Sequence, residues 1–205
     1  GRHIFTIEDP VKFVFTDHSS IVNQREVGSD TEDWPAGLKY ALRQAPDVLV
    51  IGEMRDHATV EAAINAAETG HLVLSTFHTV NAPQTVERIL SFYPDFQHQL
   101  IRLQLSMVLA GVISLRLINR QDGPGRIPAV ELMLPTPTIR ELLKAGRTDE
   151  LEKAMASDSF FGTMTFLQSL QQLYTAGKIS YNDAVAAADN PDELKLVLSG
   201  VTRGL

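Results

Sequence analysis

The sequence predicts an α/β protein with a parallel sheet in its first half and a helical end. Short apolar runs that end in polar clusters alternate with helical patterns up to about residue 90. Such alternation is typical of parallel strands joined by crossover helices. From Thr136 onward only helical patterns follow. We therefore predict an α/β core over residues 1–134 and a helical subdomain over residues 135–205.

Three short apolar runs carry the strand signal. They cover residues 3–7, 47–51 and 72–76. Pro10 follows the first run, where a proline ends ladder pairing and prevents a helix. The second run is apolar at nearly every position and is closed by Gly52, the pattern of a strand buried on both faces.

Apolar residues recur at helical spacing between and after these runs. Helices are predicted over residues 31–43, 57–69, about 83–90, and 95–113. The last of them is apolar on nearly every side, so we expect it to be buried against the sheet. A hairpin is predicted where residues 115–118 and 127–134 flank the turn sequence D-G-P-G.

Composition narrows the classes of function. The chain of 205 residues has 25 acidic against 18 basic side chains, a net charge of −7 and no cysteine. The lack of cysteine excludes disulfide frameworks, cysteine-based zinc sites, iron–sulfur clusters and thiol nucleophiles. The acidic balance argues against a nucleic-acid partner held by bulk charge. The most apolar stretch is about half as long as the roughly 20 residues of a bilayer span, so we expect a cytosolic protein.

Acidic or imidazole groups follow three of the predicted strands, where ligands bind to open parallel sheets. They are Glu8 with Asp9, Glu53 with Asp56, and His78. Each alone has a plainer interpretation, either solvation of a loop or a hydrogen-bonded structural histidine. Three such strands in one chain favour a site for a metal ion or a phosphate.

A second histidine, His71, precedes the strand that His78 follows. The length of that strand predicts a separation of about 20 Å between the two, so one zinc ion cannot bind both. A phosphate-binding loop of the form G-x-x-x-x-G-K-[ST] does not occur in the sequence. The residues alone therefore do not identify the substrate.

Short motifs follow one another through the first half of the chain. They are I-E-D-P-V at 7–11, N-Q-R-E-V-G at 23–28, A-L-R-Q-A-P-D at 41–47, I-G-E-M-R-D at 51–56, A-E-T-G-H-L-V at 67–73 and S-T-F-H-T at 75–79. In order they resemble the Asp box, the Walker B segment and the His box of the type IV pilus motor ATPases, in the PilT/PilU retraction branch. The run T-P-T-I-R-E-L-L at 136–143 resembles the helix linked there to retraction, and A-D-N-P-D-E-L at 188–194 leans toward PilU-like members.

This resemblance covers nearly the whole chain and implies a RecA-like core in a hexameric ring. Such a ring hydrolyses ATP with Mg²⁺ at its subunit interfaces and drives pilus retraction and twitching motility. It works in the cytoplasm at the inner membrane of a bacterium, with a pilus platform protein and in some cases a paralogous subunit as partners. The resemblance also implies that the sequence is a C-terminal fragment without the Walker A loop, and we expect it not to hydrolyse ATP alone.

The resemblance assigns roles residue by residue. Glu53 is expected to hold Mg²⁺, and His78 to contact the γ-phosphate and report it to a neighbouring subunit. Glu8 is the third expected catalytic residue, and nucleotide-binding residues are expected at Asp9, Lys12 and His71. The residues expected to couple the retraction helix to its partner are Ile139, Arg140, Leu142 and Leu143. Arg55 and Asp56 are expected to form a structural ion pair.

One position departs from the family pattern. At the sixth position of the Asp box the family carries a glutamate thought to activate water, and this chain has Lys12. A lysine side chain is protonated at neutral pH and cannot accept a proton. Either Glu8 or Asp9 substitutes for that glutamate, or the motor is slow, or the chain is a partner subunit of weak activity. The plainer alternative is a solvated lysine in a divergent loop.

Three other functions compete with a retraction motor. Assembly or secretion ATPases of the PilB/GspE type usually carry a four-cysteine zinc motif here, which the absence of cysteine disfavours. A RecA-like helicase needs basic loops that grip a nucleic-acid strand, and this acidic chain lacks them. A non-enzymatic module would dock onto a platform protein through the helices after Thr136. Exposure of Ile139 or Leu142 would favour docking, and burial of both would favour plain packing.

Overall fold

The computed structural model describes residues 1–200 and divides into two compact units. The first unit holds residues 1–78 and 88–108, and the second holds residues 79–87 and those from Leu109 onward. The domain boundary predicted after Leu134 lies inside the second unit and stays a prediction. Among residues 1–200, no helix is both long and apolar enough to cross a membrane.

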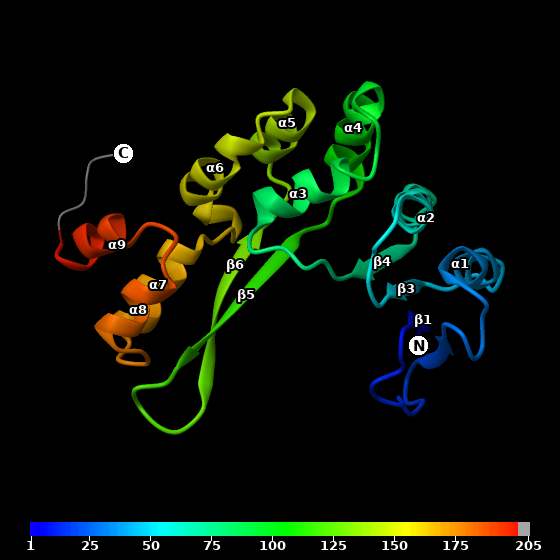
Figure 1. The fold of residues 1–205 in the computed structure, drawn as a ribbon, viewed down its shortest axis with the longest axis horizontal. Coiled ribbons are helices and arrows are strands. Elements are labelled where there is room, and N and C mark those ends of the chain that lie inside the picture. Colours follow the sequence, from blue (N-terminus) through cyan, green and yellow to red (C-terminus); the bar gives the residue numbers. More distant parts are fainter. Residues whose placement is uncertain (201–205) are drawn as a thin grey trace. The chain divides into compact units, whose positions relative to one another are not determined.

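The first unit is built on a sheet of four parallel strands in the order β2-β1-β3-β4. Figure 1 labels β1, β3 and β4 among them. The strands are β1 (His3–Glu8), β2 (Ile21–Glu26), β3 (Val48–Ile51) and β4 (Leu72–Ser75). Their register aligns Ile7 with Ile51, and Ile51 with Ser75. All the strands therefore end at the same edge of the sheet, and the predicted α/β class with a parallel sheet is confirmed.

Strand β2 is not predicted by the sequence pattern. It reads I-V-N-Q-R-E, which is polar over its second half, and none of its residues is fully buried. The strand lies at one end of the sheet and pairs only with β1. An edge strand is held by backbone pairing on one side, so it needs no continuous apolar run.

Helices α1 (Trp34–Leu42) and α2 (His57–Glu68) pack on the sheet of the first unit at the predicted places. Helix α4 (His98–Val108), preceded by the 3₁₀ turn η1 (Asp95–Gln97), packs against α2. Helix α1 begins three residues later than predicted because Asp33 is its N-cap and accepts a hydrogen bond from the Ala36 amide.

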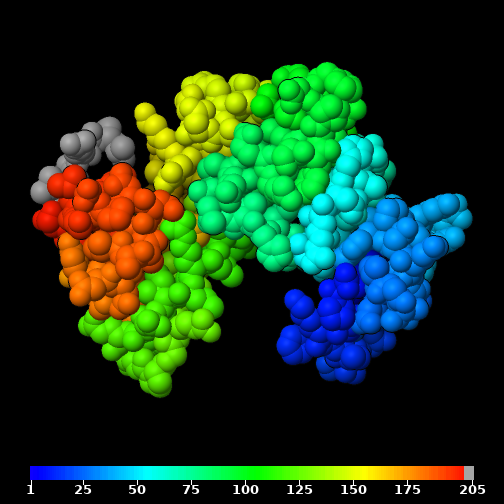
Figure 2. All heavy atoms as spheres, in the orientation of Figure 1, coloured from blue at the N-terminus to red at the C-terminus, as the bar shows by residue number. Residues whose placement is uncertain are grey.

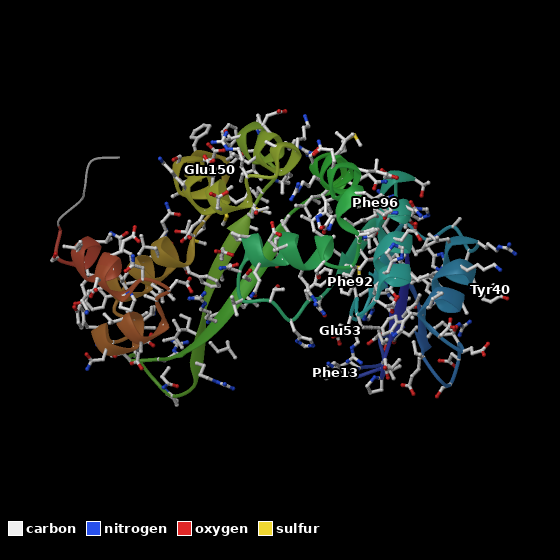
Figure 3. The ribbon with its side chains drawn as sticks, turned by 45° about the horizontal axis from the view of Figure 1, so that its top comes forward. Phe13, Tyr40, Glu53, Phe92, Phe96 and Glu150 are labelled. Atoms are coloured by element: carbon white, nitrogen blue, oxygen red, sulfur yellow. The ribbon has the colours of Figure 1, made fainter. Side chains whose placement is uncertain are left out.

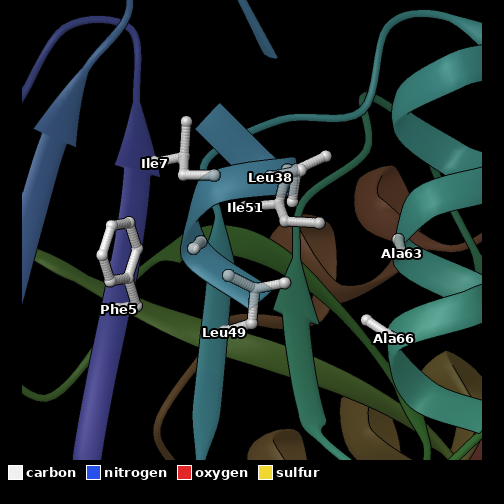
Figure 4. Close-up of a cluster of buried hydrophobic side chains, with 8 residues drawn as sticks. Phe5, Ile7, Leu38, Leu49, Ile51, Ala63 and Ala66 are labelled. Carbon is white, nitrogen blue, oxygen red and sulfur yellow. The ribbon is translucent and has the colours of Figure 1, made fainter. Parts of the chain in front are cut away.

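The core of the first unit lies between β1, β3 and two helices (Figure 4). Its buried side chains are Phe5 and Ile7 of β1, Leu49 and Ile51 of β3, Leu38 and Ala41 of α1, and Ala63 and Ala66 of α2. Alanines on α2 let that helix approach the sheet closely.

The prediction of one long helix over residues 95–113, buried against the sheet, is wrong in both respects, since the helix is shorter and packs against α2. Helix α4 ends at Val108, and Val112 already begins a strand. Ile101 and Leu105 are buried, whereas four other apolar side chains are exposed, namely Phe96, Leu100, Leu103 and Met107. The β-branched pair Val112-Ile113 after Gly111 favours extended backbone, which ends the helical pattern.

The second unit is built around the antiparallel hairpin of β5 (Val112–Asn119) and β6 (Arg126–Met133). The predicted hairpin is thus confirmed, and its turn lies at the surface, at the lower end of the green segment in Figure 2. Helix α3 (Ala82–Leu90) begins in this unit. The other elements are α5 (Pro137–Ala145), η2 (Thr148–Glu150), α6 (Leu151–Ser157), η3 (Ser159–Phe161), α7 (Phe166–Thr175), α8 (Tyr181–Ala187) and α9 (Pro191–Leu198).

One face of the hairpin carries the C-terminal helices. Ile118 and Ala129 pack in one cluster with apolar side chains from α7, α8 and α9. Arg116 of β5 donates to the Ala187 carbonyl at 2.8 Å and to both carboxylate oxygens of Asp189 at 2.8 Å. Its guanidinium also lies 3.8 Å from the centre of the Phe166 ring. A single arginine therefore joins the strand to three parts of the helical region.

Glu131 of β6 is a buried carboxylate at the start of α3. It accepts a hydrogen bond of 2.6 Å from the Ala82 amide. Burial raises the pKa of Glu131 above its ordinary value, and the hydrogen bonds from Ala82 and Ser114 oppose that rise only in part. An ionised Glu131 is therefore costlier in the folded chain than in the unfolded one.

The raised pKa of Glu131 predicts how a substitution changes with pH. A carboxyl group with a raised folded-state pKa lowers folding stability as the pH rises from its ordinary value through the raised one. Glu131→Gln removes this term, so the variant should gain stability relative to the unsubstituted protein as the pH rises above the ordinary glutamate pKa. Urea unfolding at several pH values measures the difference, and a difference that is constant with pH would contradict the expectation.

Core packing of the first unit predicts a large effect for a truncation in β3. Ile51→Ala removes a fully buried side chain and should cost about 2–5 kcal/mol of unfolding free energy. The matched control is Ile113→Ala in β5, whose side chain is 68% exposed and whose loss should cost roughly 0.5 kcal/mol or less. Chemical denaturation checks both, and equal costs would argue against the described core.

Candidate nucleotide site at the carboxyl edge of the sheet

Glu8 and Glu53 leave neighbouring strands at the same edge of the sheet. Glu8 ends β1, and Glu53 follows β3 after a single glycine. The Gly52 amide donates to the Ile7 carbonyl at 2.8 Å, and a Cβ on Gly52 would lie 3.2 Å from that oxygen and 3.4 Å from the Glu8 Cα. Glycine therefore lets the two strand ends approach closely and brings the two glutamates to one edge.

Glu53 is held between two basic groups. Its Oε2 lies 2.8 Å from Arg55 Nη2, and its Oε1 lies 3.1 Å from His78 Nε2. The side chain of Glu53, which is labelled in Figure 3, is only 19% exposed, whereas that of His78 is 85% exposed. The hydrogen bond from Arg55, then the charges of Arg55 and His78, hold the pKa of Glu53 below its ordinary value. Glu53 is thus an ionised carboxylate that faces an exposed imidazole.

Asp9 belongs to the same cluster. Its negative charge adds to that of Glu53 in raising the pKa of Arg55. Asp9, Glu53 and His78 therefore interact directly or through Arg55, which the sequence did not mark as part of the site. Glu8 ends the neighbouring strand at the same edge. Lys12 is exposed in the loop that follows Asp9.

The expected ion pair between Arg55 and Asp56 is wrong. Arg55 pairs with Glu53, and Asp56 is the N-cap of α2. Asp56 accepts hydrogen bonds from the Thr59 amide at 2.8 Å and from the Thr59 hydroxyl at 2.9 Å. The backbone amides in the first turn of α2 have no partner within the helix, and the Asp56 carboxylate accepts from one of them. Arg55 pairs with the Glu53 carboxylate instead.

Glu8 is oriented by two donors. The Thr6 hydroxyl donates to Glu8 Oε1 at 2.6 Å, and Gln24 Nε2 donates to the same oxygen at 2.9 Å. Gln24 lies on β2, inside a motif of the family resemblance, yet nothing in its residue type marks it as part of the site. Gln24 reaches Glu8 because β2 pairs with β1 in parallel, and this pairing is not predicted from the sequence.

The structure does not bring His71 to this cluster. His71 precedes β4, at the opposite end of the strand from His78. Its Nδ1 lies 3.0 Å from the Ala66 carbonyl and 3.2 Å from the Thr69 hydroxyl, so it contacts the end of α2. The expected nucleotide-binding role of His71 stays a prediction without support from this geometry.

The cluster offers few protein ligands for a divalent cation. Within residues 1–200, no group of three or more His, Asp or Glu side chains could hold a metal ion. Mg²⁺ that binds together with a nucleotide usually takes one or two protein carboxylates and completes its shell with phosphate oxygens and water. Glu53, an ionised and mostly buried carboxylate at the strand end, fits that smaller donor set.

The helix that resembles the retraction helix is packed through its apolar side chains. Ile139 and Leu143 of α5 are fully buried, and Leu142 is buried as well. Arg140 is half-buried, and its Nε donates to the Pro135 carbonyl at 3.0 Å. Burial of both Ile139 and Leu142 favours packing over docking through these side chains, and the coupling role of the four residues stays a prediction.

The contacts of Glu53 predict an order of effects on its pKa. Arg55→Gln should raise the pKa of Glu53 toward the ordinary glutamate value, because the hydrogen bond from Arg55 is the largest cause of the lowering. His78→Ala should raise it less. Carbon-detected NMR titration of the Glu53 carboxyl group measures both, with Arg126→Gln in the hairpin as a neutral control. A larger shift in the histidine variant would contradict this order.

Comparisons with known proteins point in one direction. The family model of the type II/IV secretion system proteins matches residues 1–154. The chain is 42% identical to the type IV pilus ATPase PilU of Pseudomonas aeruginosa, over 99% of this chain and 56% of that protein. It is 40% identical to the pilus retraction ATPase PilT of the same organism, over 93% of this chain and 55% of that protein.

A solved structure agrees with these relatives. The crystal structure of the pilus retraction motor PilT with bound ADP superposes with a TM-score of 0.87 at 44% identity, over 95% of this chain and 55% of that chain. The chain thus spans about half the length of the relatives it matches. The likeness confirms the RecA-like α/β class expected from the motifs. The chain belongs to the family of type II/IV secretion system proteins.

Proposed function

We propose that this chain is part of an ATP-hydrolysing motor that retracts type IV pili. The observation that carries the proposal is the convergence of Glu8, Glu53 and His78 at the carboxyl edge of one parallel sheet. Open parallel sheets bind their ligands at this edge. The likeness to PilU and PilT supplies the class of reaction, because both are named as type IV pilus ATPases.

The geometry supports a division of labour for phosphoryl transfer. The transition state spreads negative charge over the phosphoryl oxygens, so catalysis depends on positioning and fixed positive charge. When bound with ATP, Mg²⁺ would neutralise part of that charge, and Glu53 would hold it. His78 is exposed beside Glu53 and can reach a phosphate oxygen. Glu8, fixed by Thr6 and Gln24, would orient the attacking water.

Oligomer, partners and place in the cell follow from the same proposal. The motor would act as a hexameric ring, alone or with a paralogous subunit, on the cytoplasmic face of a bacterial inner membrane and against a pilus platform protein. The structure favours an enzyme over a docking module, since Ile139 and Leu142 are buried and not presented to a partner. Lys12 favours a slow motor or an accessory, PilU-like subunit within this scheme.

An ATPase assay of the full-length protein tests the proposal. With Mg²⁺ the unsubstituted protein should release phosphate from ATP, and Glu53→Gln should lower kcat by about 10²-fold, the usual loss when one fixed charge is removed from such a site. Glu32→Gln, a change of the same kind at an exposed residue outside the cluster, is the matched control and should leave kcat unchanged. Phosphate release that is insensitive to Glu53→Gln would refute the assignment.

Lys12 gives a separate expectation. Lys12→Glu restores the carboxylate that the family carries at this position and should raise kcat of the full-length protein by about tenfold or more, within the usual range for a general base. Lys12→Gln removes the charge without adding a base and should give a smaller change. If both variants hydrolyse ATP at the original rate, Lys12 is a solvated loop residue.

A further inference from the structure

We propose that Gln24 is a positioning residue that makes the orientation of Glu8 depend on the loop between β1 and β2. The inference rests on the proposed function, because it assigns Gln24 an effect on the rate of ATP hydrolysis through Glu8. The expected roles at this edge of the sheet concern Glu8, Asp9, Glu53 and His78, and none of them involves Gln24.

The amide of Gln24 joins three partners. Its Nε2 donates to Glu8 Oε1 at 2.9 Å and to the Phe13 carbonyl at 2.9 Å. Its Oε1 accepts from the Phe15 amide at 2.8 Å. Both donor hydrogens of the amide are therefore in use, one toward the carboxylate and one toward the loop. A shift of the loop backbone moves the amide, and the amide moves the carboxylate.

The loop itself has few apolar contacts to hold it. Phe13, which is labelled in Figure 3, is 75% exposed, and Val14 and Phe15 are exposed as well. Side-chain hydrogen bonds attach this loop to β2: Gln24 binds its middle, and Glu26 Oε2 accepts from the Val11 amide at 2.9 Å. Segments with little apolar burial open at low free-energy cost, so these hydrogen bonds decide the loop conformation.

The two donors on Glu8 explain why the loss of one matters. Thr6 and Gln24 reach the same oxygen from β1 itself and from β2, which fixes the plane of the carboxylate. With Thr6 alone the carboxylate can turn about that single bond. A catalytic group misplaced by about 1 Å can lose on the order of 10²-fold in rate. Loss of the hydrogen bond from Gln24 should therefore lower kcat and have a smaller effect on the affinity for substrate.

The test is a double-mutant cycle on ATP hydrolysis by the full-length protein. Gln24→Ala should lower kcat by about tenfold or more and leave KM within about twofold. In a Glu8→Ala background the same substitution should lower kcat no further, because the group on which it acts is gone. Gln24→Glu keeps an acceptor for the Phe15 amide but points a carboxylate at Glu8, so its kcat should fall at least as far.

The control and the opposing outcomes separate this inference from the proposed function. Asn23 lies beside Gln24 on β2, and Asn23→Ala removes only its 3.0 Å contact with His3 Nε2 of β1, so this variant should leave kcat unchanged. Circular dichroism checks that each variant folds, and Gln24→Glu serves where Gln24→Ala does not. Equal losses from Gln24→Ala in both backgrounds would show a general structural role and overturn the inference. If the unsubstituted protein does not hydrolyse ATP, the proposed function itself fails.

Discussion

The parallel pairing of β1 with β3 is the constraint on which the candidate site depends. Parallel strands in register send their carboxyl ends to one edge, and Gly52 lets the two ends approach closely, because a Cβ there would lie 3.2 Å from the Ile7 carbonyl oxygen. Glu8 and Glu53 are distant in sequence and become neighbours for this reason alone. The site is therefore a consequence of sheet topology, and the residues that matter most for its assembly, Ile51 and Gly52, carry no chemistry themselves.

The charged groups around Glu53 are better explained by the function of the site than by a contribution to folding stability. Exposed ion pairs contribute little to folding, and Arg55 and His78 are both largely exposed. Their effect is instead to keep Glu53 ionised although its side chain is largely buried. A ligand that brings its own positive ion could share the Glu53 carboxylate with these groups. The same residues would then turn toward the phosphate charge that the ligand adds.

The sequence predicts those features that depend on local pattern. Strands β1, β3 and β4 are apolar runs, and the turn of the hairpin is read from D-G-P-G. Strand β2 is missed because pairing with β1 stabilises it, and the burial of α4 is misjudged because burial depends on which elements pack against a helix. The partner of Arg55 is missed for a third reason, since the first turn of α2 competes for Asp56. Site residue types are predictable, and their mutual contacts are not.

The loop after β1 links the one unusual residue of the Asp box to the chemistry. Lys12 lies next to Phe13, whose carbonyl shares the Gln24 amide with Glu8. A substitution at Lys12 can therefore act in two ways, by supplying or removing a base and by shifting the loop that orients Glu8. Only the second effect passes through Gln24, because proton transfer needs no contact with that amide. In the proposed motor, Lys12 in place of the glutamate that the resemblance implies would change both the charge near the site and the loop that contacts Gln24.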